Sequence, residues 1–96
     1  QELIKSNPLD ADALYLLAGH EAKYGDKNKA LLLYDQSSRG DGIFKSRALL
    51  EKGKVLVALK RYKDALKPLT EYAKLDASDS VRNYIKAVKA LAEASH

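Results

Sequence analysis

The stretches "YGDKNKALLLY" at residues 24–34 and "LKRYKDALKPL" at residues 59–69 present the same features in the same order. In each, a short polar break leads into an Ala-Leu pair, and the pairs Ala30-Leu31 and Ala65-Leu66 lie 35 residues apart. The same shift aligns Ala13-Leu14 with Ala48-Leu49, Ala18 with Gly53, Ala22 with Val57, and Tyr34 with Leu69. Two antiparallel helices cannot bury their apolar side alone, whereas stacked copies can. The shift therefore predicts one helical unit used more than once.

The composition sets limits on the class of protein. A chain of 96 residues suits one small domain with a core of its own. The absence of Cys excludes disulfides and thiolate metal sites, and it is compatible with both the cytoplasm and the periplasm. No apolar run approaches the roughly 20 residues of a membrane span, and no signal-peptide pattern opens the chain. Because Gln1 stands where an initiator Met would be, we expect a piece of a longer protein.

The net charge of +4 is unevenly distributed. Residues 1–44 hold five Lys and Arg against seven Asp and Glu, a net charge of −2, while residues 45–96 hold twelve against six, a net charge of +6. A basic half can mark a site for an acidic partner or for nucleic acid. It can equally be a solvated surface rich in Lys.

Helix formers and helical periodicity predict an all-α chain with five helices. The expected helices run from an N-cap at Asp10 to Gly25, from an N-cap at Asp26 to Arg39–Asp41, over 44–59, over 62–75, and from Ser78 or Asp79 onward. The break at Lys60-Arg61 has neither Gly nor Pro and is predicted from the repeat alone. Pro68 lies inside the fourth helix, where its missing N–H predicts a local kink.

The two aligned units, residues 11–44 and 46–79, share the order of a known helical repeat. Each has large apolar and small residues in its first helix, and Ala followed by a large apolar residue in its second. The matching residues are Leu14, Leu17, Ala18, Ala30 and Tyr34 in the first unit, and Leu49, Gly53, Leu56, Ala65 and Leu69 in the second. This pattern resembles the tetratricopeptide repeat (TPR), a helix–turn–helix unit of about 34 residues.

The resemblance implies a right-handed superhelical stack of antiparallel helical hairpins, a TPR-like α-solenoid. The departures from the family pattern are Glu21 for Tyr, Lys52 for Leu, and Gly42 and Ala77 for Pro. Pro8 stands where a preceding unit would end, so residues 1–9 are expected to close an earlier repeat. Residues 80–96 are expected to form a capping helix or the start of a truncated third repeat.

The resemblance also implies a non-enzymatic scaffold for protein–protein interaction, in which the first helix of each unit lines a concave groove. The partner-binding residues expected on this basis are Asp12, Tyr15, Gly19, Lys23, Arg47, Leu50, Lys54 and Val57. They combine apolar positions with cations, which fits a protein or peptide segment with apolar anchors and acidic flanks. The alternative is that the fifth helix or a further repeat simply covers Leu50 and Val57.

Some TPR proteins bind chaperone tails through a two-carboxylate clamp of Lys, Asn and Arg at fixed places. In this chain those places hold Tyr15, Gly19, Glu51, Val81 and Ile85. None of the five matches, so the sequence argues against a chaperone-tail clamp.

The sequence contains no catalytic, metal-binding or cofactor-binding constellation that we recognise. His20-Glu21 begins a zinc motif, but Tyr24 occupies the second His position. Gly40-Asp41-Gly42 follows no predicted strand and lacks a further Gly for a phosphate loop. Two alternative functions remain: self-association into a homo-oligomer, and nucleic-acid binding by the basic half. The second is weakened because that half lacks Arg clusters and interleaved aromatic residues.

Overall fold

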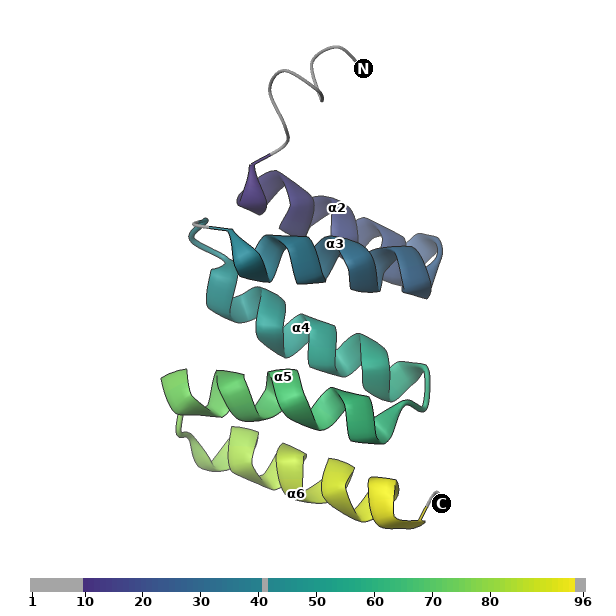
Figure 1. The fold of residues 1–96 in the computed structure, drawn as a ribbon, viewed down its shortest axis with the longest axis vertical. Coiled ribbons are helices and arrows are strands. Elements are labelled where there is room, and N and C mark those ends of the chain that lie inside the picture. Colours follow the sequence, from purple (N-terminus) through teal and green to yellow (C-terminus); the bar gives the residue numbers. More distant parts are fainter. Residues whose placement is uncertain (1–9, 41, 95–96) are drawn as a thin grey trace.

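The structure, a computed structural model, describes residues 10–40 and 42–94, and within these ranges the chain is all-helical (Figure 1). The helices are α2 (Ala11–Tyr24), α3 (Lys27–Arg39), α4 (Lys45–Ala58), α5 (Tyr62–Leu75) and α6 (Asp79–Ala94). The predicted all-α class is confirmed, and the helix bounds agree with the predicted ones to within one or two residues. The expectations for residues 1–9 and for Asp41 lie outside the described residues.

The five helices form a single row in which each helix packs against the next along the chain and runs in the opposite direction (Figure 1). α2 and α6 lie at opposite ends of this row, which measures 46 × 26 × 18 Å. Within the described residues the row does not close on itself, so the arrangement differs from a closed helical bundle. It brings α2, α4 and α6, the alternate members of the row, into the same orientation.

The predicted N-caps of the first two helices are confirmed. The carboxylate of Asp10 accepts a hydrogen bond from the backbone N–H of Ala13 at 2.8 Å, and that of Asp26 accepts one from Asn28 at 2.9 Å. Both bonds satisfy N–H groups that have no partner within the helix. α4 and α5 begin without a side-chain cap of this kind.

The turn between α4 and α5 depends on backbone geometry. Lys60 has a φ of 62°, in the left-handed region. Its N–H donates to the carbonyl of Val57 at 2.9 Å, and the N–H of Arg61 donates to that of Leu56 at 2.8 Å. This pair of bonds is the Schellman ending of a helix, which usually has Gly at the left-handed position. The break that only the repeat predicted is thus a well-bonded turn.

The core consists of two clusters, each formed by one hairpin and the helix that follows it. The first contains Ala18, Ala30, Tyr34, Ala48 and Val55, and the second contains Leu56, Ala65, Leu69 and Val88. Leu31 packs against both clusters and so joins the hairpins. A Cβ atom added at Gly53 would lie only 2.5 Å from Cγ and Cδ2 of Leu69, so α4 and α5 meet closely here. The four small residues of the repeat pattern, Ala18, Ala30, Gly53 and Ala65, are all buried and so serve the packing of the helices.

Two large apolar residues that fit the helical period are partly exposed. Leu17 is 39% exposed, and Leu91 is 42% exposed. In α6 the side that faces α5 is centred on Val88, and the next residue on that side is Ala92, one turn further on, which is 4% exposed. Leu91 lies at the edge of this contact. α5 continues through Pro68, which is buried. The local kink predicted at this residue therefore does not divide the helix.

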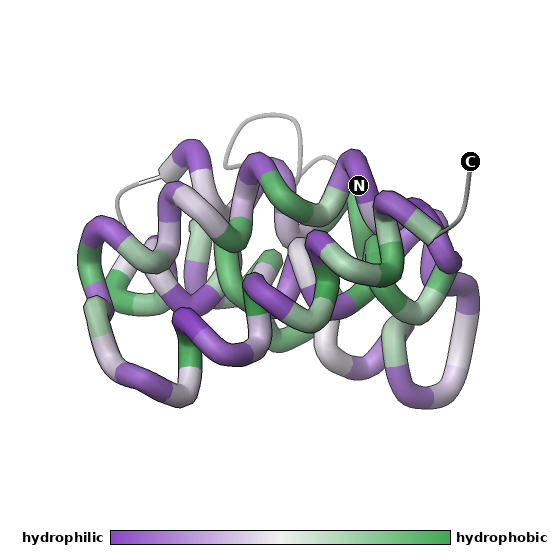
Figure 2. Tube along the Cα trace, turned by 90° about the horizontal axis from the view of Figure 1, so that it is seen from below, coloured by the Kyte–Doolittle hydropathy of each residue, from purple (hydrophilic) through white to green (hydrophobic). Residues whose placement is uncertain are grey.

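Polar contacts join the helices at their ends and edges. The hydroxyl of Ser37, which is fully buried, donates to the carbonyl of Ala11 at 2.7 Å and joins the end of α3 to the start of α2. Lys52 Nζ donates to Asp35 Oδ1 at 2.6 Å and joins α4 to α3. Figure 2 shows hydrophilic and hydrophobic residues alternating along the helices, as expected for amphipathic helices in contact with water. No helix in the described part of the chain is long and apolar enough to cross a membrane.

Candidate partner-binding face

Three of the predicted groove residues are engaged in the packing of the row. The carboxylate of Asp12 accepts a hydrogen bond from the backbone N–H of Phe44 at 3.2 Å, at the start of α4. Gly19 lies beside the Tyr34 hydroxyl, which an added Cβ would approach to 3.5 Å. Val57 packs against the second core cluster. These residues help to position α2, α3, α4 and α5 relative to one another.

Tyr15 lies in an aromatic group that spans the first two hairpins. Its ring stacks on Phe44 with centroids 4.5 Å apart and planes 13° apart, and it meets the edge of Tyr34 at 5.6 Å. Such contacts are worth about 0.5–1.5 kcal/mol beyond the buried area. Tyr15 is only half-buried, so part of its ring still faces solvent.

Arg47 and Lys54, on the exposed side of α4, share one carboxylate. Glu51 lies 3.7 Å from Arg47 and 3.9 Å from Lys54, at i,i+4 and i,i+3 spacing. The neighbouring Tyr15 hydroxyl is the main cause of a raised pKa at Arg47, and the negative charge of Glu51 adds to the shift. Two cations around one carboxylate leave an excess positive charge next to Tyr15.

Leu50 and Lys54 line a hollow that the sequence did not predict. It has a volume of about 230 Å³ and lies between α4 and α6, where Ser80, Val81 and Tyr84 form its other wall. Leu50 is half-buried against the second core cluster together with Tyr84. The sequence left open whether the fifth helix, which is α6, covers Leu50. α6 lies beside Leu50 across the hollow, so this side chain is partly covered and partly lines the hollow.

Glu51 also influences the tyrosines of this region. Burial raises the pKa of Tyr34 to about 12, and the negative charge of Glu51 adds to the shift. Burial likewise raises the pKa of Tyr84, again with a contribution from Glu51. Both hydroxyls therefore stay protonated at neutral pH and remain available as hydrogen-bond donors.

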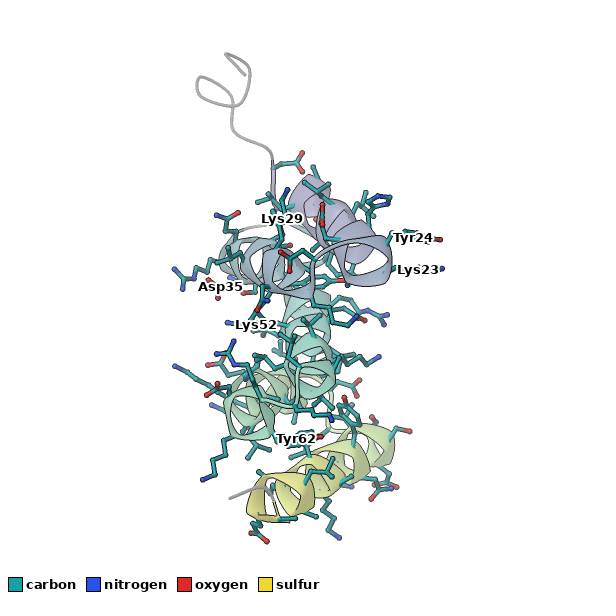
Figure 3. The ribbon with its side chains drawn as sticks, turned by 90° about the vertical axis from the view of Figure 1, so that its right-hand side faces the viewer. Lys23, Tyr24, Lys29, Asp35, Lys52 and Tyr62 are labelled. Atoms are coloured by element: carbon teal, nitrogen blue, oxygen red, sulfur yellow. The ribbon has the colours of Figure 1, made fainter. Side chains whose placement is uncertain are left out.

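Lys23, the remaining predicted residue, lies near the C-terminal end of α2, apart from the hollow. Its ammonium stands 5.4 Å from the ring centroid of Tyr24, and both side chains project from the molecule (Figure 3). Figure 3 also shows Asp35 and Lys52 on the opposite side, where α3 and α4 are joined. The structure thus brings Tyr15 to Arg47, and Leu50 to Lys54, and leaves Lys23 outside both groups.

The sequence reasoning missed Glu51, Val81 and Tyr84. The spacing of Glu51 from Arg47 and Lys54 was a usable signal, since charges three and four residues apart meet on a helix. The contribution of α6 had no local signal, because it depends on how closely α6 approaches α4.

Comparisons of this chain with protein-family models, with curated proteins and with solved structures gave no match.

Proposed function

We propose that the protein is a non-enzymatic, TPR-like module that binds a peptide or protein segment on the face formed by α2, α4 and α6. In this proposal the row of helices is part of a right-handed superhelix, and α2, α4 and α6 line its concave side. The repeated Ala-Leu pattern and the single row of antiparallel helices support the assignment.

The observation that carries the proposal is the hollow between α4 and α6. Its walls combine the apolar side chains of Leu50 and Val81 and the ring of Tyr84 with the ammonium of Lys54. An apolar side chain of a partner would enter the hollow and remove these groups from water. An acidic neighbour in the partner would meet Lys54 and Arg47, whose charges Glu51 only partly offsets.

The test uses displayed random 12-mer peptides, selected on the folded protein and then measured singly by fluorescence anisotropy. We expect enriched peptides to pair a bulky apolar residue with Asp or Glu. Leu50→Ala should weaken their binding by about tenfold or more, because a buried apolar contact of this size is worth about 1.5–3 kcal/mol. Lys54→Glu should weaken it through charge.

The matched control is Lys27→Glu, which makes the same charge change at an exposed position in the first turn of α3, outside the residues that line the hollow. Helical circular dichroism should be the same for all variants. Peptides that bind Leu50→Ala and Lys54→Glu as tightly as the parent protein would contradict the proposed face.

Self-association is a second candidate function, and one observation favours it. Leu16 and Tyr24 on α2 are 64% and 71% exposed, and Leu32 on α3 is 65% exposed. Leu16 and Tyr24 lie eight residues apart and so share one side of α2. Exposed apolar groups of this kind are typical of interfaces. A sedimentation coefficient that rises with concentration, and stops rising in Leu16→Lys, would support a homo-oligomer. A monomer at all concentrations would exclude it.

A further inference from the structure

The outer side of α6 carries a row of exposed cations. Arg82, Lys86 and Lys89 follow one another at spacings of four and three residues, which places them on one side of the helix. Arg82 pairs with Asp79 of the same helix. Lys86 and Lys89 take part in no ion pair within residues 10–40 and 42–94. Figure 2, seen from below, has this helix nearest to the viewer.

A comparison with α4 shows what this side of α6 corresponds to. Val55 in α4 and Val88 in α6 lie 33 residues apart, and each is buried against the hairpin that precedes its helix. The same shift places Arg82, Lys86 and Lys89 at the positions of Leu49, Gly53 and Leu56. In α4 this side is covered by α5, and Gly53 lies directly against Leu69. α6 therefore presents cations where α4 presents a seat for a closely packed helix.

Two shallow hollows run along this side of α6 and share Lys89. One, of about 440 Å³, is lined by Asp79, Arg82, Asn83, Ile85, Lys86 and Lys89. The other, of about 410 Å³, is lined by Lys63, Leu66, Lys89, Ala92 and Glu93. Together they extend along some four turns of α6, roughly 20 Å. Ile85, Leu66 and Ala92 make their walls partly apolar, and the cations stand around them.

We propose that this face of α6 and α5 binds an acidic amphipathic helix of a partner protein. The charges of Lys63, Arg82, Lys86 and Lys89 outweigh those of Asp79 and Glu93, so an acidic helix is complementary. The apolar walls would take its Leu or Ile side chains. A second copy of the chain presenting the same face would bring the same cations and be repelled.

A nucleic acid fits this face less well. Proteins that bind single strands place aromatic rings beneath the bases. The two hollows are lined by aliphatic, small, amide and charged side chains, and no aromatic ring is among their lining residues. The cations alone would hold a phosphate backbone, but the apolar walls would then stay exposed to water.

The test uses a labelled 20-residue peptide of Ala, Glu and Leu, with Leu every third or fourth residue and Glu beside each Leu. Anisotropy should show saturable binding that weakens as the salt concentration rises, since exposed charges are screened within about 10 Å at 0.1 M salt. Lys86→Glu/Lys89→Glu should weaken binding by about tenfold or more. The same peptide with each Glu replaced by Lys should not bind.

Three comparisons make the test decisive. Lys54→Glu, which alters the hollow between α4 and α6, should leave affinity for this peptide unchanged, so the two proposed sites can fail separately. A scrambled peptide of the same composition, with Leu on all sides, should bind at least several-fold more weakly. The proposed occupant would be overturned if the protein bound any one of three other ligands as tightly as the designed helix, with the same loss in Lys86→Glu/Lys89→Glu. These ligands are the scrambled peptide, a uridine 20-mer and phosphatidylserine vesicles.

Discussion

The hairpins α2–α3 and α4–α5 differ in how they turn and in how their helices meet. In the first, Asp26 caps α3 and Ala18 is buried in the same core cluster as Tyr34. In the second, the left-handed Lys60 makes the turn, and Gly53 makes room for Leu69. Each hairpin thus holds a small residue in its first helix and a large one in its second. The pair is Ala18 and Tyr34 in the first hairpin, and Gly53 and Leu69 in the second. The comparison shows that the two hairpins pack a small residue against a large one with different residues in each.

The largest effect is expected from the Gly53–Leu69 contact. Leu69→Ala should destabilise the protein by about 3 kcal/mol, because it removes a fully buried side chain and leaves a cavity. Gly53→Ala should also destabilise it, by about 1–3 kcal/mol, because the new Cβ would collide with Leu69. Urea unfolding followed by circular dichroism measures both changes.

The double variant Gly53→Ala/Leu69→Ala sharpens this prediction. Once Leu69 is shortened the collision disappears, and Ala is then the better helix former by about 1 kcal/mol. Gly53→Ala should therefore change sign and stabilise the Leu69→Ala protein. Additive losses in the double variant would show that the two residues are not coupled.

Tyr34, which stands in the first hairpin where Leu69 stands in the second, makes the first hairpin sensitive to alkaline pH. Its pKa is about 12 in the folded protein and 10.0 in the unfolded chain. The folded state therefore holds the proton more tightly, and the resulting stability is fully present below pH 10 and is lost between pH 10 and pH 12. The loss should reach roughly 2–3 kcal/mol.

Tyr34→Phe supplies the control for this pH dependence. It keeps the ring that meets Tyr15 and removes the ionising hydroxyl. Denaturant midpoints of the two proteins, compared from pH 8 to pH 12, should diverge above pH 10, with Tyr34→Phe the more stable. Parallel midpoints over this range would contradict the prediction.

The turn of the first hairpin should be sensitive to its cap. Asp26→Ala removes the acceptor for the N–H of Asn28 and should cost about 1 kcal/mol in thermal or urea unfolding. Asp26→Ser, which keeps a side-chain acceptor, should recover most of the loss. Equal stability of the Ala and Ser variants would mean that the cap contributes little.

The smallest effect is expected in the turn of the second hairpin, and it has the opposite sign. Lys60→Gly removes the cost of holding a residue with a Cβ in the left-handed region, which is about 1–2 kcal/mol. It also raises the conformational entropy of the unfolded chain, which lowers the free energy of unfolding by about 0.5–1 kcal/mol. The net result should be a gain of about 0.5 kcal/mol, measurable as a higher urea midpoint. Lys60→Ala, which keeps the Cβ, should show no such gain.

Local signals in the sequence were sufficient for much of the fold. Asp10 and Asp26 mark helix starts through their side chains, and α2 ends beside Gly25. Lys60 carries no such signal, so only the 35-residue repeat indicated its turn. Leu91 fits the helical period of α6 but is 42% exposed, because the contact with α5 is centred on Val88 and continues to Ala92.

The candidate site was less predictable, because its geometry depends on the approach of helices distant in sequence. Arg47, Leu50 and Lys54 could be named from their places on α4. The stacking of Tyr15 on Phe44 and the wall that Tyr84 adds to the hollow depend on how α2 and α6 lie beside α4. No spacing within one helix contains that information.

The single row of helices has a consequence for how this protein folds and opens. Because packing joins each helix mainly to its neighbours along the chain, the loops that must close are short. Such topologies have low contact order and fold rapidly. Among the described residues 10–40 and 42–94, α4 has a helix packed on both sides, whereas α2 and α6 stand at the ends of the row. We therefore expect α4 to exchange its amide hydrogens last.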